Sequence, residues 1–202
     1  MRARLLGKDA LLLECDGPGQ VRAAYAEARE RRERGELDCV DVVPGATTVL
    51  LDGLRERERA QDSLSDWRLE EPDLDEADVV ELSITYDGPD LETVAAHWGL
   101  SVEEAVKCHR ELDHVVAFCG FAPGFAYVSG LPEGLAVPRL REPRSEVPAG
   151  AVGLAGRFTG IYPRPSPGGW QLIGRTDARL WDLRRTNPAL LVPGTRIRFV
   201  DG

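Results

Sequence analysis

The stretch that decides the fold runs from residue 120 to residue 176. Most of it reads GFAPGFAYVSG (120–130), VPRLREPRSEVPAGAVGLAGRFTGIYP (137–163) and SPGGWQLIGRT (166–176). More than half of the chain's 21 glycines and of its 14 prolines fall within it. Glycine permits positive φ and close backbone approach, and proline fixes φ and removes a hydrogen-bond donor. The pattern predicts short strands joined by tight turns, which favours a small β-barrel over a parallel sheet with crossover helices.

The N-terminal part carries a different pattern. A strand is predicted over residues 5–14, and apolar residues at helical spacing then predict a helix that ends at Gly35. Two strands, 38–43 and 47–52, follow around a Pro-Gly turn, and a more polar helix covers residues 55–67. One further strand would complete this β-α-β-β-α order as a ferredoxin-like unit.

The acidic stretch EEPDLDEAD (70–78) separates these two patterns and is interpreted as a linker. We therefore expect an α+β protein of two domains. The first is a ferredoxin-like domain at residues 1–78, and the second is a β-barrel domain at residues 79–202.

Two helices are expected at the start of the second domain. Asp90 is the N-cap candidate of the first helix, which Gly99 ends, and Ser101 with Glu104 forms a capping-box pattern for the second. The spacing also resembles a helix-turn-helix, but a DNA reader needs a basic, exposed second helix. This helix begins Ser-Val-Glu-Glu, which favours an ordinary pair of packed helices.

Composition excludes several classes of function. The chain has 202 residues and a formal net charge of -9, which argues against nucleic acid and anionic membranes as partners. No apolar run approaches the ~18 residues of a membrane span, and the short N-terminal apolar run is unlike a signal peptide. The four cysteines form no CxxC pair and no metal-ligand spacing. We expect reduced thiols, no metal site and a cytoplasmic location.

Positive charge collects in the glycine- and proline-rich stretch, which holds six arginines, no lysine and three glutamates. Arg139, Arg144 and Arg175 lie beside Pro or Gly turns, and guanidinium groups bind carboxylates and phosphates through paired hydrogen bonds. Gly168 and Gly169 are placed to offer backbone N–H groups to the same anion. The competing interpretation is that the arginines cap barrel carbonyls and the two glycines form a hairpin corner.

Aromatic residues of the same stretch can supply the apolar walls of a pocket for a small anionic ligand. Otherwise they fill the barrel. These residues are Phe121, Phe125, Tyr127, Tyr162 and Trp170. His109 precedes the stretch and is a candidate acid or base, the alternative being a partly buried helix histidine. The sequence has no GxSxG elbow, Walker A motif or GxGxxG motif.

Longer motifs carry a family resemblance. GFxPGFxYxxGL, VPRxxxPRxxVPAGxVGxAG, TGIYPxxSPGGWQLIGRT and PGTRIRFV closely resemble the KipI family. That family is also described as the first subunit of allophanate hydrolase, or as the B subunit of the bacterial three-component 5-oxoprolinase (PxpB). The resemblance covers most of the chain, because PGATTVLLD and YDGPDLETVA also fit. It implies a ferredoxin-like N-terminal domain followed by a cyclophilin-like β-barrel C-terminal domain.

The resemblance also implies a function and partners. Such a chain works with a second, larger subunit and a third hydrolase component, and the complex opens 5-oxoproline to L-glutamate at the expense of ATP. We therefore expect an amidohydrolase subunit that is active only with its partners and acts on a small anionic substrate, with ATP bound by the complex. Other relatives are named for inhibiting a sporulation histidine kinase. The alternative is thus a regulatory protein that docks on a sensor kinase.

In this interpretation His109 and Arg144 are the catalytic candidates. One departure from the family concerns Phe158, which stands where members usually carry Gln; the change removes an amide donor and acceptor near the expected pocket. The expected substrate-binding residues are Phe121, Pro123, Phe125, Tyr127, Arg139, Thr159, Tyr162, Gly168, Gly169, Trp170, Gln171 and Arg175.

Overall fold

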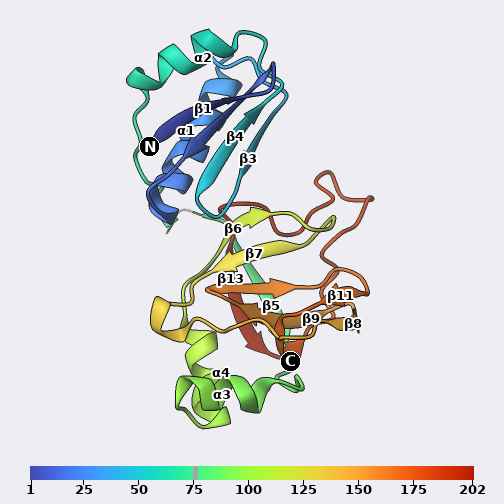
Figure 1. The fold of residues 1–202 in the computed structure, drawn as a ribbon. Helices are drawn as coiled ribbons and strands as arrows, with labels where there is room; N and C mark the ends of the chain where they lie inside the picture. Colours follow the sequence, from blue (N-terminus) through green and yellow to red (C-terminus); the bar gives the residue numbers. More distant parts are fainter. Residues whose placement is uncertain (75–76) are drawn as a thin grey trace. The chain divides into compact units, whose positions relative to one another are not determined.

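The computed structural model describes residues 1–74 and 77–202 (Figure 1). The chain divides into two compact units, Met1–Glu76 and Ala77–Gly202. Both units combine helices with strands, which confirms the predicted α+β class. Within the described ranges, no helix is both long enough and apolar enough to cross a membrane.

The first unit is a four-stranded antiparallel sheet covered by a helix. The strand order is β1-β2-β4-β3, and α1 packs against β3 and β4 across one face of the sheet (Figure 1). Inward side chains of β2 and β4 alternate with outward ones and are fully buried, as expected for a sheet with one covered face. The elements are β1 (Arg2–Leu6), β2 (Ala10–Glu14), α1 (Pro18–Glu33), β3 (Asp41–Pro44), β4 (Thr48–Asp52), α2 (Arg57–Ser63) and the 3-10 helix η1 (Leu64–Asp66).

The single strand predicted over residues 5–14 is wrong, because this segment contributes to two strands. β1 and β2 pair antiparallel with Leu6 opposite Ala10, and the chain turns at Gly7, whose φ is +56°. Glycine reaches this left-handed region without a Cβ clash. The strand that fills the fourth place in the sheet therefore comes from the N-terminus and not from a segment after α2.

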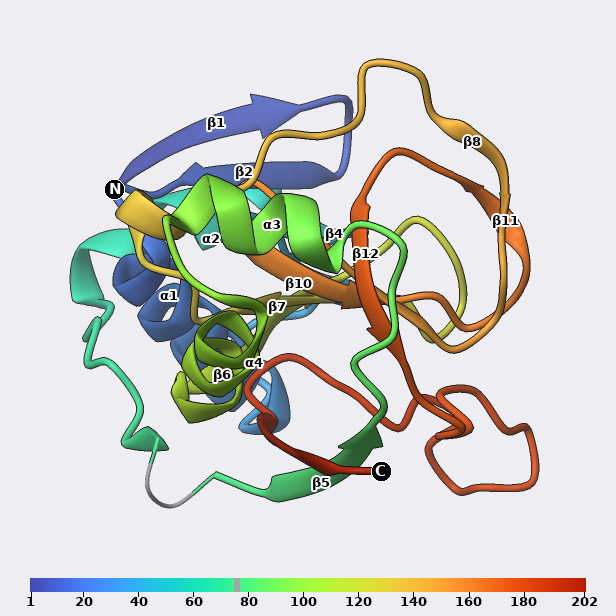
Figure 2. The same ribbon diagram turned by 90° about the horizontal axis from the view of Figure 1, so that it is seen from below.

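The second unit contains most of the strands. α3 and α4 pack against each other, α3 also contacts β12 and α4 contacts β13. Figure 2 shows the same elements from below. They are β5 (Val79–Ile84), α3 (Leu91–Trp98), α4 (Val102–Glu111), β6 (His114–Cys119), β7 (Ala126–Ser129), the 3-10 helix η3 (Glu133–Leu135), β8 (Arg144–Val147), β9 (Ala151–Ala155), β10 (Phe158–Ile161), β11 (Ser166–Gly168), β12 (Gln171–Arg175) and β13 (Arg196–Asp201).

Seven of these strands form a nearly closed barrel, in the order β12-β9-β10-β7-β6-β13-β5. The two ends of this row meet at a seam. Thr85, just after β5, forms an antiparallel bridge with Arg175 of β12, and both N–H···O distances are 2.9 Å. The barrel expected from the spacing of Gly and Pro is thereby confirmed.

The seam depends on glycine because backbones touch there. A Cβ on Gly174 would overlap the carbonyl oxygen of Thr85, and a Cβ on Gly88 would overlap the backbone from Leu172 to Gly174. Glycine is the residue that allows so close an approach. The sequence between β5 and α3 is therefore fixed by contact with β12.

The two helix starts follow different rules. Ser101 Oγ accepts the N–H of Glu104 at 3.2 Å, and the Glu104 carboxylate accepts the N–H of Ser101 at 2.8 Å, so the predicted capping box is confirmed. Asp90 stands at the N-cap position of α3 but makes no side-chain cap hydrogen bond. Its carboxylate instead accepts the N–H of Leu172 in β12 at 2.6 Å. The predicted N-cap position of Asp90 is confirmed, but its side chain binds β12 and does not cap the helix.

The seam gives a first test. We expect Gly174→Ala to lower the free energy of unfolding by about 2 kcal/mol, since a methyl group forced into a packed contact strains the backbone. Gly134→Ala is the matched control: its Cβ would meet nothing within 4 Å, so the change should stay within about 0.5 kcal/mol. Urea unfolding followed by circular dichroism measures both. Equal losses for the two variants would contradict a tight seam.

Candidate functional site

The aromatic residues of the predicted pocket form one connected cluster in the second unit. Phe125 is its centre, with ring centroids of four neighbours at 5.1–5.6 Å in edge-to-face arrangements. Such geometry is the favoured one for aromatic pairs. The cluster consists of Phe118, Phe121, Phe125, Tyr127, Phe158, Tyr162 and Trp170.

Two glycines form the floor under this cluster. Gly153 and Gly160 are opposite each other on β9 and β10. A Cβ on Gly160 would lie 2.7 Å from the Trp170 ring and 2.8 Å from the Phe125 ring, and a Cβ on Gly153 would lie 3.1 Å from Trp170 Cβ. The rings therefore occupy the volume that side chains at these positions would take. Phe125, Tyr162 and Trp170 are buried, so for them the core-packing interpretation is the better one.

Arg144 is held by the protein itself. Its Nη2 atom donates to both carboxylate oxygens of Asp90 at 2.8 and 2.9 Å, and Nη1 donates to the carbonyl oxygen of Trp170 at 3.3 Å. Asp90 is buried and also accepts the N–H of Leu172. Arg144 begins β8, which pairs with β11, so this ion pair ties the two-stranded β8–β11 ribbon to the start of α3.

The other two predicted arginines differ from Arg144. Arg175 Nε donates to Asp87 at 2.8 Å in an ion pair that is about half exposed to solvent. Arg139 is exposed and forms no ion pair with another described residue. Of the three, Arg139 is the one whose guanidinium is open to a ligand anion.

Arg139 lies near the hydroxyl of Tyr162. Burial raises the pKa of Tyr162, while the positive charges of Arg139 and Arg144 and a hydrogen bond from the backbone N–H of Trp170 act to lower this pKa. A Cβ on Gly168 would overlap the same hydroxyl, and the Gly169 carbonyl accepts the N–H of Leu140 at 2.8 Å. The Arg139 guanidinium, the Tyr162 hydroxyl and the turn at Gly168 and Gly169 thus lie together at the edge of the aromatic cluster.

His109 and Thr159 come together away from this edge. His109 Nε2 lies 3.1 Å from Thr159 Oγ1 and Nδ1 lies 2.8 Å from the Tyr86 hydroxyl, and desolvation raises the pKa of Tyr86. Successive residues of a strand point to opposite faces, so Thr159 faces away from the side where Phe158 and Gly160 meet the aromatic rings. His109 and Thr159 are almost fully buried. The Thr159 hydroxyl, the His109 imidazole and the Tyr86 phenol are arranged like a nucleophile with its base, but solvent does not reach the Thr159–His109 pair.

His114 adds a second buried imidazole beside the first. Its Nε2 lies 2.6 Å from the His109 carbonyl oxygen, and the ring centroids of the two histidines are 4.7 Å apart. Nε2 must carry the proton because a carbonyl oxygen only accepts. Burial lowers the pKa of both histidines, and for His109 lowers it far below the ordinary value of 6.5; the nearby His114 adds to this. Both rings are neutral at pH 7.

The remaining predicted residues are scattered. Pro123 and Phe121 are exposed in the loop before β7, whereas Gln171 is buried, with Nε2 donating to the Pro138 carbonyl at 3.3 Å. Gln171 Oε1 is buried and has no hydrogen-bond partner among the described residues. Phe158, which stands where family members usually carry Gln, is half-buried and makes an edge-to-face contact with Tyr127. Sequence reasoning missed Tyr86 and Asp90 as partners of the predicted residues.

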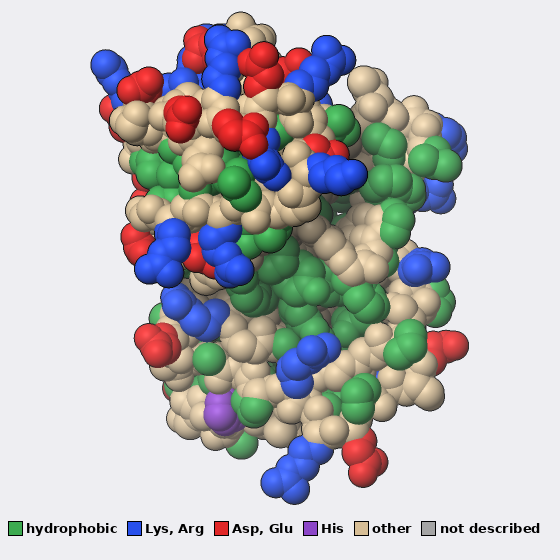
Figure 3. All heavy atoms as spheres, turned by 45° about the horizontal axis from the view of Figure 1, so that its top comes forward, with side chains coloured by type: hydrophobic (Ala, Val, Ile, Leu, Met, Phe, Trp, Pro, Cys, Tyr) green, Lys and Arg blue, Asp and Glu red, His purple; other side chains and the backbone are tan. Residues whose placement is uncertain are grey.

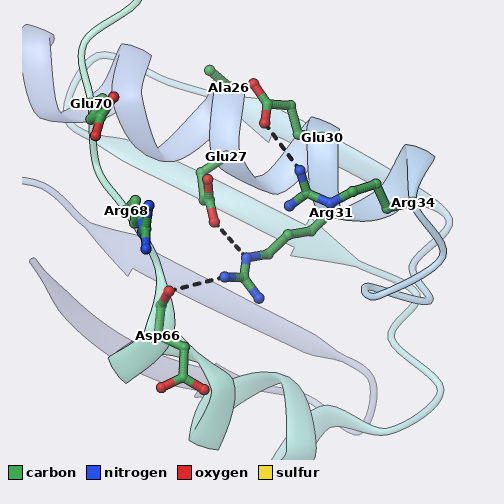
Figure 4. Close-up of a pocket in the computed structure, with 8 residues that line it drawn as sticks. All are labelled: Ala26, Glu27, Glu30, Arg31, Arg34, Asp66, Arg68 and Glu70. Atoms are coloured by element: carbon green, nitrogen blue, oxygen red, sulfur yellow. Dashed lines mark hydrogen bonds and ion pairs between the residues drawn. The ribbon is translucent and has the colours of Figure 1, made fainter.

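Three of the surface cavities in the described parts of the chain lie elsewhere. The largest of them, about 390 Å³, is in the first unit (Figure 4), where Arg31 binds Glu27 at 2.6 Å and Arg34 binds Glu30 at 3.3 Å. The others, of about 280 and 200 Å³, border β5 and β13, and the first includes Arg175. Among the described residues, no group of three or more His, Cys, Asp or Glu side chains is arranged to hold a metal ion.

Comparisons with known proteins define the class. The family model for the carboxyltransferase domain, subdomain C and D, matches residues 1–191, which places the chain among these domains. Over 207 residues the chain is 40% identical to the B subunit of 5-oxoprolinase from Escherichia coli O157:H7, and the match covers 98% of this chain and 95% of that protein. The chain belongs to the family of 5-oxoprolinase B subunits, which confirms the resemblance seen in its motifs.

Solved structures agree with this assignment. The crystal structure of TTHA0988 is 34% identical, with a TM-score of 0.80 over 96% of this chain, which corresponds to only 40% of the TTHA0988 chain. The urea amidolyase of K. lactis has a TM-score of 0.75 over 99% of this chain and 15% of that chain. At 17% identity, this second likeness concerns the fold alone.

The Arg144–Asp90 pair can be tested by comparing two arginines. Arg144→Ala should lower the free energy of unfolding by about 2 kcal/mol, because a buried carboxylate loses its charged hydrogen-bond donors. Arg175→Ala breaks an exposed pair and should cost within about 0.5 kcal/mol. Chemical unfolding measures both variants. If Arg144→Ala is as mild as Arg175→Ala, then Arg144 does not hold the ribbon.

The buried histidines make stability depend on pH. The folded state holds both rings neutral, so below pH 6.5 the unfolded state binds more protons than the folded state. The free energy of unfolding should therefore fall as pH drops from 7 to 5, by up to about 1 kcal/mol per pH unit for each histidine.

Urea titrations at several pH values measure this slope. His109→Gln should reduce the slope, and His97→Gln, at an exposed position of α3, is the comparison variant. A slope that is the same in all three proteins would show that other groups cause the acid sensitivity.

Proposed function

We propose that this chain is the B subunit of an ATP-dependent 5-oxoprolinase complex, in which a cyclic amide is hydrolysed only when the partner subunits are present. The observation that carries the proposal is the match over nearly the full length of both chains with a protein named as the B subunit of 5-oxoprolinase. The site geometry supports the need for partners, because the hydroxyl–imidazole pair of Thr159 and His109 is closed to solvent.

We extend the proposal to the architecture of each unit. The sheet order β1-β2-β4-β3 supports a ferredoxin-like domain at residues 1–78, in which the N-terminal strand takes the place of the final strand. The seam between β5 and β12 supports a cyclophilin-like barrel at residues 79–202.

The proposed reaction sets clear chemical requirements. Amide resonance makes the lactam carbonyl a poor electrophile. Transfer of a phosphoryl group from ATP to the lactam oxygen activates the carbonyl carbon and turns that oxygen into a leaving phosphate. One water adds to that carbon, and the ring nitrogen takes up a proton as the C–N bond breaks. A second water displaces the phosphate, so both oxygens of the new carboxylate come from water. Fixed cations and N–H groups stabilise the negative charge of such a step. In this proposal other subunits bind the ATP.

Within this chain, we assign the contact with the substrate anion to the exposed guanidinium of Arg139. The nearby Tyr162 is buried and belongs to the core beneath it. The absence of an ion pair at Arg139 among the described residues supports this choice, since Arg144 already neutralises Asp90. Gly168 and Gly169 form the corner beside them. Arg144 acts as a positioning residue that holds the ribbon, and His109 has a structural role in the core.

The alternative role, inhibition of a sensor histidine kinase, is not favoured. Matched relatives are named as 5-oxoprolinase subunits. Neither the barrel nor the buried histidine pair gives a specific reason to expect a kinase as partner.

Reconstitution tests the proposed function. The chain should be purified alone and together with the other subunits of its own organism, and ATP hydrolysis should be measured with and without 5-oxoproline. We expect turnover only in the mixture. Robust turnover by the chain alone, or none by the mixture, would overturn the proposal.

A pair of arginine variants then tests the site. Arg139→Ala should raise the KM for 5-oxoproline by roughly 10- to 100-fold, the effect of losing a hydrogen bond to a charged group. Arg32→Ala, on the exposed face of α1, is the control and should leave KM unchanged. Equal KM values for the two variants would remove Arg139 from the binding site.

A further inference from the structure

Large apolar side chains reach solvent on two neighbouring loops of the second unit. Phe121 is 61% exposed, Trp181 is 39% exposed and Leu183 is 78% exposed. We call these three residues the loop patch. Aromatic residues are enriched at the centres of protein interfaces, and exposed apolar clusters mark interaction sites.

The two loops are fixed against each other. Gly124, at φ +84°, lies against the second loop, and a Cβ there would be 3.0 Å from Trp181 Cβ and 3.3 Å from the Leu180 backbone. Trp181 in turn forms an antiparallel bridge with Ala189, so the second loop is a small hairpin with Leu183 near its tip. The patch is therefore presented by ordered backbone.

Phe121 is held in an unfavourable backbone conformation. Its φ is +66°, and it is the one non-glycine residue with positive φ within residues 1–74 and 77–202. Hydrogen bonds from Ala122 N–H to the Gly120 carbonyl (2.7 Å) and from Phe125 N–H to the Ala122 carbonyl (2.9 Å) hold the turn. Left-handed backbone at an aromatic residue is rare and tends to occur at functional positions. Here the strained turn carries a phenyl ring that stays largely in solvent.

The edge of the patch is basic, unlike the chain as a whole. Arg179, Arg184 and Arg185 surround a single carboxylate, Asp182. The Arg184 guanidinium lowers the pKa of Asp182 to about 2, so this carboxylate stays ionised. On the face drawn in Figure 3, basic and acidic side chains are interspersed. A partner that fits this edge offers an apolar hollow bordered by acidic residues.

The coverage of a relative indicates what occupies the patch. The match with TTHA0988 covers 96% of this chain but only 40% of the TTHA0988 chain. In that protein the same fold is therefore part of a longer polypeptide. The B subunit from Escherichia coli O157:H7 is matched over 95% of its length, so in that protein the fold has no such extension and its partner must be reached through a surface.

We propose that the loop patch of Phe121, Trp181 and Leu183 is the docking surface for a second subunit, equivalent to the part of TTHA0988 that this chain does not match. The proposal rests on the proposed role as a subunit. The occupant meets the three side chains with an apolar hollow and their basic edge with carboxylates.

Binding of the second 5-oxoprolinase subunit from the same organism tests this surface. The full chain and three variants should be titrated with that subunit by calorimetry. Leu183→Asp and Phe121→Ser should each weaken binding roughly tenfold or more, as expected for centres of an interface. Val40→Asp is the matched control, since Val40 is 70% exposed but lies in the first unit. Thermal melts verify that every variant is folded.

Each outcome decides the proposal. Wild-type affinity in folded Leu183→Asp and Phe121→Ser variants would overturn it, as would the absence of any complex with the wild-type chain. Self-association of the chain that Leu183→Asp abolishes would assign the patch to a second copy and also overturn it. A complex weakened by the patch variants, together with a mixture of all the subunits that does not hydrolyse ATP with 5-oxoproline, would support the surface while refuting the proposed substrate.

Discussion

The contact between the segment after β5 and strand β12 is the constraint on which the barrel depends. Thr85 and Arg175 exchange two backbone hydrogen bonds there, and Gly174 leaves the space that the Thr85 carbonyl occupies. Asp90 extends the same junction, because its carboxylate binds the Leu172 N–H and the Arg144 guanidinium together. One buried carboxylate thus joins the barrel seam, the start of α3 and the β8–β11 ribbon.

Much of the fold could be predicted from local sequence signals. The capping box at Ser101 and Glu104 depends on residues three apart, so it was visible in the sequence and is confirmed. The barrel was visible because its turns need Gly and Pro. The β1–β2 hairpin was missed since apolar residues continue on both sides of Gly7, and only the partner strand β4 shows which half belongs to the core.

The candidate site was less predictable, because the roles of its residues depend on distant partners. Arg139 and Arg144 have similar neighbours in the sequence, and nothing local shows that Asp90, 54 positions away, pairs with the second and not the first. His109 likewise finds Tyr86 and Thr159 through tertiary packing, which turns a candidate base into a core residue. Composition indicated a cationic, aromatic region; only geometry separates the free cation from the paired one.

The glycine pair beneath the aromatic cluster changes the meaning of a glycine-rich sequence. Gly153 and Gly160 stand opposite each other in β9 and β10, and the rings of Phe125 and Trp170 cover them. These glycines leave the space that the aromatic rings occupy, and their role here is packing and not flexibility of the backbone. The backbone amides of β9 and β10 should therefore exchange their hydrogens as slowly as any in the barrel. Local unfolding of these strands would have to separate them from two packed aromatic side chains.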